Sequence, residues 1–151
     1  MLKRNPALYL LDILVSIDRV RRFSVNMASV QDLIKNESAC SAVLRELSII
    51  GEAMNHVLRV DSLTRLVKPE WRDVVDFRNI LIHEYFGVSF SEIYGIIKND
   101  IPILEQEIIS ILRHLNSSEL LQSAMDCAID ELKQMERIES LVYLNKIKGS
   151  L

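Results

Sequence analysis

Glycine and proline are scarce in this chain, which has four glycines and three prolines among its 151 residues. Because these residues mark turns and loops, their scarcity excludes a fold built from many tight turns. Leu, Ile, Glu and Ser are plentiful, and no segment shows the alternating pattern of a β-strand. The composition therefore predicts an all-α protein, long enough for one domain with a real hydrophobic core.

A strong charge of either sign is also lacking, since the formal net charge is −3. Such a chain has no global positive field of the kind that non-specific nucleic-acid binders use. One local basic cluster exists, formed by Arg19, Arg21 and Arg22. We interpret this cluster as a solvated helix face, with an RNA contact as the alternative.

Cysteines and histidines are few and dispersed. Cys40 and Cys127 lie far apart without CxxC spacing, which predicts two buried thiols in a reducing cytoplasm. The three histidines lie beside no acidic pair, so neither a metal nor another cofactor is expected. The first apolar run is interrupted by Asp12 and has no cleavage site after it, which argues against a signal peptide and a membrane span. We expect a cytoplasmic protein without membrane contact.

Hydrophobic residues at helical spacing divide the chain into helices. Asn5 and Pro6 begin the first, Asn36 and Ser89 are candidate caps, and Pro69 opens the helix that carries the motif below. The predicted elements are a helix over 6–23, one turn over 30–34, helices over 37–59 and 69–85, and a helix over 90–115 that Pro102 kinks or splits. Gly87 suits the position after the third long helix.

The C-terminal segment shows a four-three spacing of apolar residues typical of a coiled-coil seam. These residues are Leu121, Met125, Ala128, Leu132, Met135 and Val142. We predict a fifth long helix here, either packed on the bundle or used in oligomerisation. The expected organisation is a helical bundle over 1–115 and a C-terminal extension over 116–151.

The stretch RNILIHEY (78–85) concentrates reactive side chains on a helix. On a helical wheel, Arg78 lies in the middle of an apolar arc, with Tyr85 about 20° away. That arc consists of Val74, Val75, Phe77, Leu81 and Ile82. A guanidinium in an apolar arc must be paired or must open onto a polar cleft. Glu52 and Asp76 are the candidates to pair with Arg78 or to orient His83.

Asn79 and His83 lie on the opposite side of the same helix, about 40° apart, and His83 is about 140° from Arg78. A histidine can take a proton from a ribose 2′-hydroxyl, and an arginine can stabilise the charge that develops on a phosphate. These residue types are sufficient for RNA cleavage without a metal. One rigid helix does not bring Arg78 and His83 together, so we expect a homodimer with a shared cleft.

At this motif the sequence resembles the HepT-like toxins of the HEPN superfamily, whose signature is Arg-x4-His-x-Tyr. The segments AVLRELSIIGEAMNHVL (42–58), WRDVVDFRNILIHEYFGVSFSEIY (71–94) and IIKNDIPILEQEI (96–108) agree in order, and the resemblance covers about residues 7–114. It implies an up-down antiparallel helical bundle that forms a homodimer with an RNase site between protomers. Arg78 and His83 fall on the catalytic positions, and Asn79 on the accompanying polar position.

The resemblance also implies a partner, a nucleotidyltransferase antitoxin of the MntA type that transfers AMP to Tyr85. AMP on this tyrosine would place bulk and negative charge close to His83. Two alternatives remain open at this stage. One is a non-catalytic helical partner that binds a nucleotide for a minimal nucleotidyltransferase, and the other is a purely structural interaction module.

Overall fold

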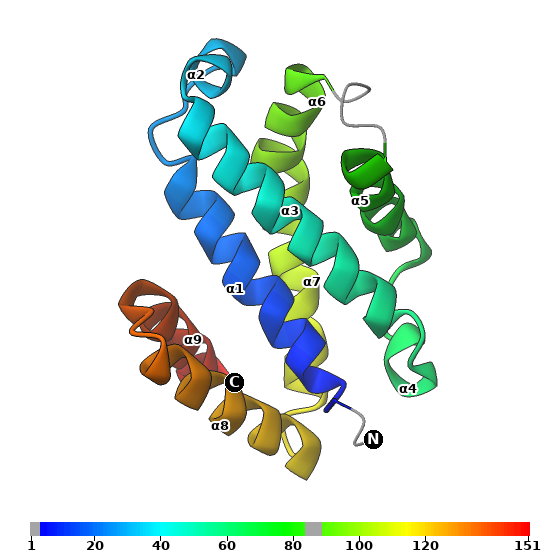
Figure 1. The fold of residues 1–151 in the computed structure, drawn as a ribbon. Coiled ribbons are helices and arrows are strands. Elements are labelled where there is room, and N and C mark those ends of the chain that lie inside the picture. The colour runs from blue at the N-terminus through cyan, green and yellow to red at the C-terminus, as the bar shows by residue number, and fades with distance from the viewer. Residues whose placement is uncertain (1–3, 84–88) are drawn as a thin grey trace.

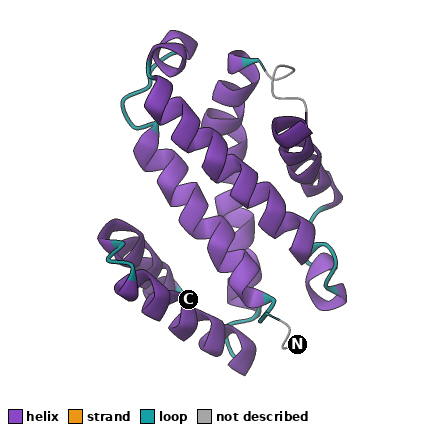
Figure 2. Cartoon of the chain, viewed as in Figure 1, coloured by secondary structure: helices purple, strands orange, loops and turns teal. Residues whose placement is uncertain are grey.

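The computed structural model describes residues 4–83 and 89–151, and for Ile80, Ile82 and His83 it describes the backbone. Helix is the only regular secondary structure in these residues (Figures 1 and 2), which confirms the all-α prediction. The α-helices are α1 (Ala7–Phe23), α2 (Val30–Lys35), α3 (Glu37–Val57), α4 (Asp61–Thr64), α5 (Arg72–His83), α6 (Phe90–Gly95), α7 (Ile101–His114), α8 (Glu119–Gln134) and α9 (Ile138–Ser150). A 3-10 turn (Pro69–Trp71) precedes α5, and a π-helical segment (Ile96–Asp100) joins α6 to α7.

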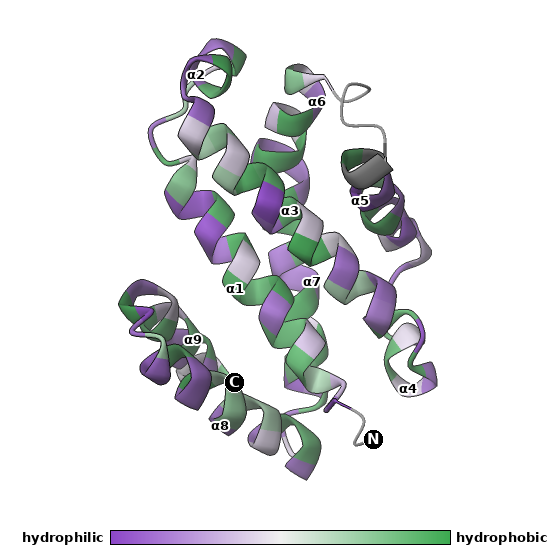
Figure 3. Ribbon diagram, viewed as in Figure 1, coloured by the Kyte–Doolittle hydropathy of each residue, from purple (hydrophilic) through white to green (hydrophobic). Residues whose placement is uncertain are grey.

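The helices α1, α3, α5 and α6–α7 run alternately up and down, so the predicted antiparallel bundle is present (Figure 1). Helix α3 is the common neighbour, because both α1 and α5 pack against it. The core is filled by aliphatic side chains without solvent exposure, among them Leu14 and Ile17 of α1 and Leu112 of α7. Hydrophobic and hydrophilic patches alternate along these helices, as expected for amphipathic elements (Figure 3).

Side-chain caps fix the starts of several helices. Asn36 Oδ1 accepts a hydrogen bond from the Ala39 amide at 3.1 Å, and Ser89 Oγ accepts one from the Glu92 amide at 3.1 Å. Both caps satisfy amide groups that lack a partner within the helix. The two predicted caps are therefore confirmed, and Ser89 sets where the chain re-enters the bundle after α5.

The break expected at Pro102 takes the form of a π-helical segment rather than a kink alone. Pro102 has no amide hydrogen, so the helix cannot make its usual hydrogen bond to the carbonyl four residues earlier. The Ile101 amide instead bonds to the Ile96 carbonyl, five residues back. The change in hydrogen-bonding pattern ends α6 after six residues and begins α7 at Ile101.

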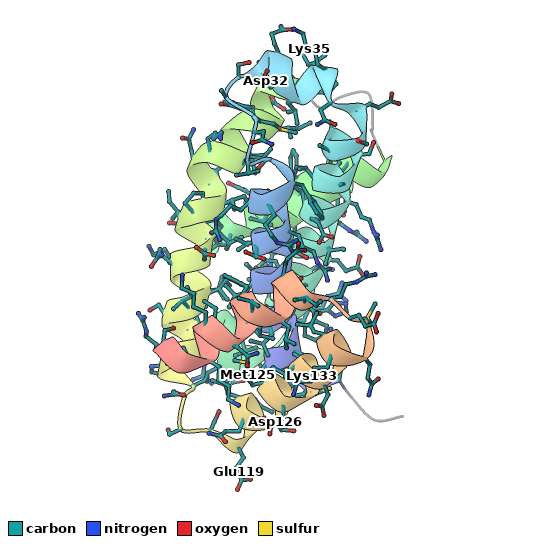
Figure 4. The ribbon with its side chains drawn as sticks, turned by 90° about the vertical axis from the view of Figure 1, so that its left-hand side faces the viewer. Asp32, Lys35, Glu119, Met125, Asp126 and Lys133 are labelled. Carbon is teal, nitrogen blue, oxygen red and sulfur yellow. The ribbon has the colours of Figure 1, made fainter. Side chains whose placement is uncertain are left out.

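The C-terminal segment was predicted as one long helix, and this is wrong. The chain turns between α8 and α9, where Glu136 has a φ of 53°, in the left-handed region that ends helices. The first part of the predicted seam packs inward, since Leu121 and Met125 are 2% and 3% exposed and α8 lies against α1. Its last members, Met135 and Val142, are exposed. Figure 4 shows α9 crossing in front of α1, with α8 below it and Glu119 pointing away from the bundle.

The basic cluster of α1 holds this C-terminal pair in place. Arg21 Nη2 and the Tyr143 hydroxyl both donate to Glu105, each at 2.7 Å. Burial and the hydrogen bond to Glu105 raise the pKa of Tyr143 well above its ordinary value. The hydrogen bond to Glu105 outweighs the effect of burial and raises the pKa of Arg21. These contacts join α1, α7 and α9.

The other two arginines act in the same way. Arg22 Nη1 donates to Glu139 at 2.9 Å, and Arg19 Nε donates to Ser140 at 3.3 Å. Acidic and hydroxyl groups from other helices thus pair with all three arginines, while the Arg21 side chain stays 47% exposed. The sequence of α1 alone does not show which groups of the other helices these arginines contact.

One prediction about the thiols is also corrected. Cys40 is buried, but Cys127 is exposed, because it lies on the outward side of α8 between Asp126 and the buried Ala128. Among the described residues, none of the helices combines the length and hydropathy needed to cross a membrane.

Candidate functional site

The motif helix α5 lies directly on α3 at a glycine. A Cβ atom placed on Gly51 would be 2.2 Å from Arg78 Cβ and 3.0 Å from the Val74 carbonyl oxygen. These separations are too short for any side chain, so only glycine permits this approach. Sequence reasoning did not single out Gly51, although an isolated glycine inside a helical pattern is a signal of close packing.

Arg78 crosses α3 at this glycine and reaches two polar partners. Its Nη2 donates to Glu52 Oε2 at 2.6 Å, and its Nη1 donates to Asn79 Oδ1 at 3.0 Å. The Arg78 side chain is 23% exposed, and Nε has no hydrogen-bond partner among the described residues. The guanidinium within the apolar arc is thus paired with a carboxylate, one of the two expected solutions.

The burial of the other described residues of α5 agrees with the helical wheel. Val75 and Leu81 are buried against α3, whereas Asp76 and Asn79 are exposed. Of the two acids considered as partners of Arg78, Glu52 makes the contact. Asp76 has neither a hydrogen bond nor an ion pair with another described side chain.

His83 is the last residue of α5, and its side chain is not described. Tyr85 and Gly87, like the predicted helix end at Tyr85 or Phe86, lie outside the described residues. The roles assigned to His83 and Tyr85 therefore stay predictions.

Beyond Glu52, the site continues along α3 toward α1. Glu52 Oε1 is 3.9 Å from His56 Nε2, one helical turn further. The His56 ring stacks on the Tyr9 ring with 4.5 Å between centroids and 6° between planes. The Arg4 guanidinium lies over Tyr9, 4.9 Å from the ring centroid, and donates to Asp12 at 2.6 Å. Sequence reasoning missed these residues because α1 and α3 meet only in the folded chain.

Chemically, the arrangement offers an oriented guanidinium at the surface. A carboxylate and an amide oxygen hold Arg78 on two sides, which fixes its plane while leaving part of it accessible. An arginine held in this way can bind a phosphate group with two hydrogen bonds. In the described part of the chain, no three His, Cys, Asp or Glu side chains gather where they could hold a metal ion.

Comparison with known proteins identifies related chains. The family described as ribonuclease HepT-like matches residues 13–111. A candidate RNase of Methanocaldococcus jannaschii is 35% identical over 108 residues, which are 72% of this chain and 97% of that protein. A protein of Thermococcus cleftensis described as a probable ribonuclease HepT is 35% identical over 106 residues, which are 69% of this chain and 93% of the relative.

A third relative extends the similarity into the C-terminal helices. It is a protein of Methanocaldococcus jannaschii described as a gamma-glutamylcyclotransferase and candidate RNase, 28% identical over 141 residues. The alignment takes in 93% of this chain, but this chain covers 62% of that longer protein. No solved structure matches the chain significantly.

Proposed function

Because this chain belongs to the HepT-like ribonuclease family, we propose that it is an endoribonuclease and the toxin of a toxin–antitoxin pair. The observation that carries the proposal is the Arg78 guanidinium, held by Glu52 and Asn79 at the surface of the motif helix. The pair also leaves part of the guanidinium exposed, which a purely structural role for Arg78 does not require. A ribonuclease needs such a group for the scissile phosphate.

The proposed reaction is a metal-independent transphosphoesterification. His83 takes the proton of the ribose 2′-hydroxyl, and the 2′-oxygen attacks the adjacent phosphorus. The bond between phosphorus and the 5′-oxygen breaks, and that oxygen leaves with a proton supplied by a second general acid. The products are a 2′,3′-cyclic phosphate and a 5′-hydroxyl. Arg78 stabilises the charge on the phosphate oxygens, and Asn79 fixes the guanidinium through its Oδ1 atom.

We propose that the active form is a homodimer in which the two motif helices face each other. The support comes from helix geometry, since positions 78 and 83 are about 140° apart on a helical wheel. A facing copy would provide the second histidine as the general acid. The division into a bundle (1–115) and a C-terminal extension (116–151) is part of this proposal, with the extension fastened to α1 and the α5 surface left free.

Silencing by an antitoxin of the MntA type completes the proposal. The antitoxin transfers AMP from ATP to the Tyr85 hydroxyl, which forms a phosphodiester and releases pyrophosphate. Tyr85 is two residues after His83, so the added phosphate would repel an RNA backbone at the site. The support for this step is the His-x-Tyr spacing of His83 and Tyr85, which matches the family signature.

The test is cleavage of total cellular RNA in EDTA by the purified full chain, beside His83→Ala and Arg78→Lys. We expect cleavage by the wild type with 2′,3′-cyclic phosphate ends, none by His83→Ala, and a large loss in Arg78→Lys, which keeps the charge but not the fork geometry. Intact mass and peptide mapping establish beforehand whether Tyr85 carries AMP.

Unmodified wild-type protein that leaves RNA intact would contradict the proposal. Tight nucleotide binding by that inactive protein would instead favour the non-catalytic partner of a nucleotidyltransferase. Equal activity of His83→Ala and the wild type would overturn the mechanism.

A further inference from the structure

A groove between the first turn of α1 and the second half of α3 begins where the Arg78 contact ends. It has a volume of about 410 Å³, within the range of small-molecule sites. Arg4, Tyr9 and Asp12 line one side, and Arg45, Glu52 and His56 line the other. The small side chains Ser48 and Ala53 leave the space between the two helices open. We call this hollow the α1–α3 groove.

Glu52 lines the groove and also contacts Arg78 of the motif. Glu52 accepts the Arg78 hydrogen bond through Oε2, and its Oε1 atom lies 3.9 Å from His56 Nε2. A strand of RNA with a phosphate on Arg78 would therefore place its neighbouring nucleotide at the mouth of the groove.

The groove wall is a stack of flat groups. Tyr9 contacts both other groups, with 4.9 Å from the Arg4 guanidinium to the Tyr9 ring centroid and 4.5 Å from that centroid to the His56 ring centroid. Tyr9 is half-buried, while the His56 side chain is 40% exposed. Flat, partly exposed rings on a firm base are the chemistry that recognises an unpaired nucleobase.

The charges of the groove also favour a phosphate backbone. Asp12 and Glu52 are the two acids, and each already pairs with an arginine, Arg4 and Arg78 respectively. Arg45 is exposed and makes no ion pair with another described side chain. It lies seven residues before Glu52 on α3, roughly 10 Å along the helix axis. Arg45 and His56 therefore lie on opposite sides of Glu52, the residue that Arg78 contacts, so Arg45 can bind a phosphate on one side of the scissile phosphate while His56 meets a base on the other.

From these observations we infer that the α1–α3 groove is the substrate-binding subsite of the proposed ribonuclease. It binds single-stranded RNA, with one unpaired base stacked on His56 and, on the other side of the scissile phosphate, a further backbone phosphate on Arg45. This inference rests on the proposed function and adds the substrate class. Double-stranded RNA is a poor substrate, because its paired bases cannot reach a flat wall of this kind.

The test measures binding of a fluorescent ten-nucleotide single-stranded RNA carrying 2′-O-methyl groups, which lacks the attacking hydroxyl and cannot be cleaved. The full chain is compared with His56→Ala, His56→Phe and Arg45→Ala. We expect His56→Ala to weaken binding roughly tenfold, while His56→Phe keeps the flat ring and stays within about threefold of the wild type. Arg45→Ala reduces the slope of the salt dependence by about one.

Two matched controls lie outside the groove on α7. His114→Ala removes another exposed histidine, and Arg113→Ala removes another exposed arginine. Neither is expected to change RNA affinity. A duplex of the same sequence is expected to bind at least tenfold more weakly than the single strand.

Cleavage of unmodified RNA, measured in parallel, separates the two proposals. If the wild type cleaves RNA but His56→Ala and Arg45→Ala bind it normally, the subsite is wrong and the ribonuclease stands. If the wild type neither binds nor cleaves RNA, both proposals fail. If His56→Ala changes the oligomeric state in sedimentation and not the RNA affinity, the groove is an interface with a second copy, and the inference is overturned.

Discussion

Gly51 and Arg78 touch across the α3–α5 interface so closely that a Cβ on Gly51 would lie 2.2 Å from Arg78 Cβ. Replacing Gly51 with alanine should push α5 off α3 and lower the free energy of unfolding by about 1–3 kcal/mol, as overpacking does. The shift also displaces Arg78 from Glu52, so RNA cleavage should fall. Urea denaturation and the cleavage assay measure the two effects.

Gly95→Ala is the matched control for this change. A Cβ on Gly95 meets nothing within 4 Å, and its backbone is helical. Alanine there should leave stability unchanged or raise it by up to about 1 kcal/mol. If Gly51→Ala were as stable as Gly95→Ala, the close packing of α5 on α3 would be contradicted.

Glu52→Gln separates the stabilising from the orienting effect of the Arg78 pair. The Glu52 side chain is 56% exposed and Arg78 is 23% exposed, so the ion pair is screened by solvent and contributes less than about 1 kcal/mol. Glutamine keeps an acceptor oxygen but loses the negative charge, so it holds the guanidinium less firmly, and we expect RNA cleavage to slow about tenfold. Unfolding curves close to those of the wild type with slower cleavage would support this role, whereas unchanged cleavage would remove it.

Two methionines of the predicted C-terminal seam test whether that seam packs in the core or forms an interface with a second copy. Met125 is 3% exposed in α8 and Met135 is 58% exposed at its end. Met125→Ala should lower the free energy of unfolding by about 2–5 kcal/mol, because it leaves a cavity in the core. Met135→Ala should change it by less than about 0.5 kcal/mol. A shift of oligomeric state in Met125→Ala at unchanged stability would point to an interface instead.

Tyr143 predicts a pH dependence at the alkaline end. Its pKa is raised in the folded chain, so above pH 10, the ordinary pKa of tyrosine, the unfolded chain loses a proton that the folded chain keeps. The stabilisation by Tyr143 is therefore complete below pH 10 and declines as the pH rises further. Tyr143→Phe should be about 1 kcal/mol less stable than the wild type at pH 7.

That difference between Tyr143→Phe and the wild type should shrink at pH 10.5, where unfolding curves can be compared directly. If the difference in unfolding free energy stayed constant between pH 7 and pH 10.5, the hydrogen bond from the Tyr143 hydroxyl to Glu105 would not raise the pKa of Tyr143. The remaining titratable groups are common to both proteins and cancel in the comparison.

Local signals carried most of the fold from the sequence. The caps at Asn36 and Ser89 depend on residues within three positions, and both were predicted. Pairing of Arg78 was one of two expected outcomes, since a charge in an apolar arc must be paired or must open onto a polar cleft. The turn at Glu136 was missed because no glycine, proline or asparagine marks it.

The features that the sequence did not predict are contacts between helices far apart in the chain. The stack of Tyr9 on His56 joins residues far apart in the chain, and neither residue carries a pattern that points to the other. The same holds for Arg21 and Tyr143, which meet at Glu105. Prediction of such pairs requires knowing which faces of α1, α3, α7 and α9 are opposed, and that is decided by packing.

The orientation of α6 relative to α7 depends on the number of residues in the π-helical segment Ile96–Asp100. A π-type hydrogen bond accommodates one residue more than an α-helix would need. Deleting one residue there would shorten the connection between α6 and α7 and rotate everything on its N-terminal side by about 100° relative to α7. The Ser89 cap and the incoming connection from the motif helix would then face a different side of the bundle. Insertions and deletions at this segment are thus a means by which the position of the motif relative to the rest of the bundle can change during evolution.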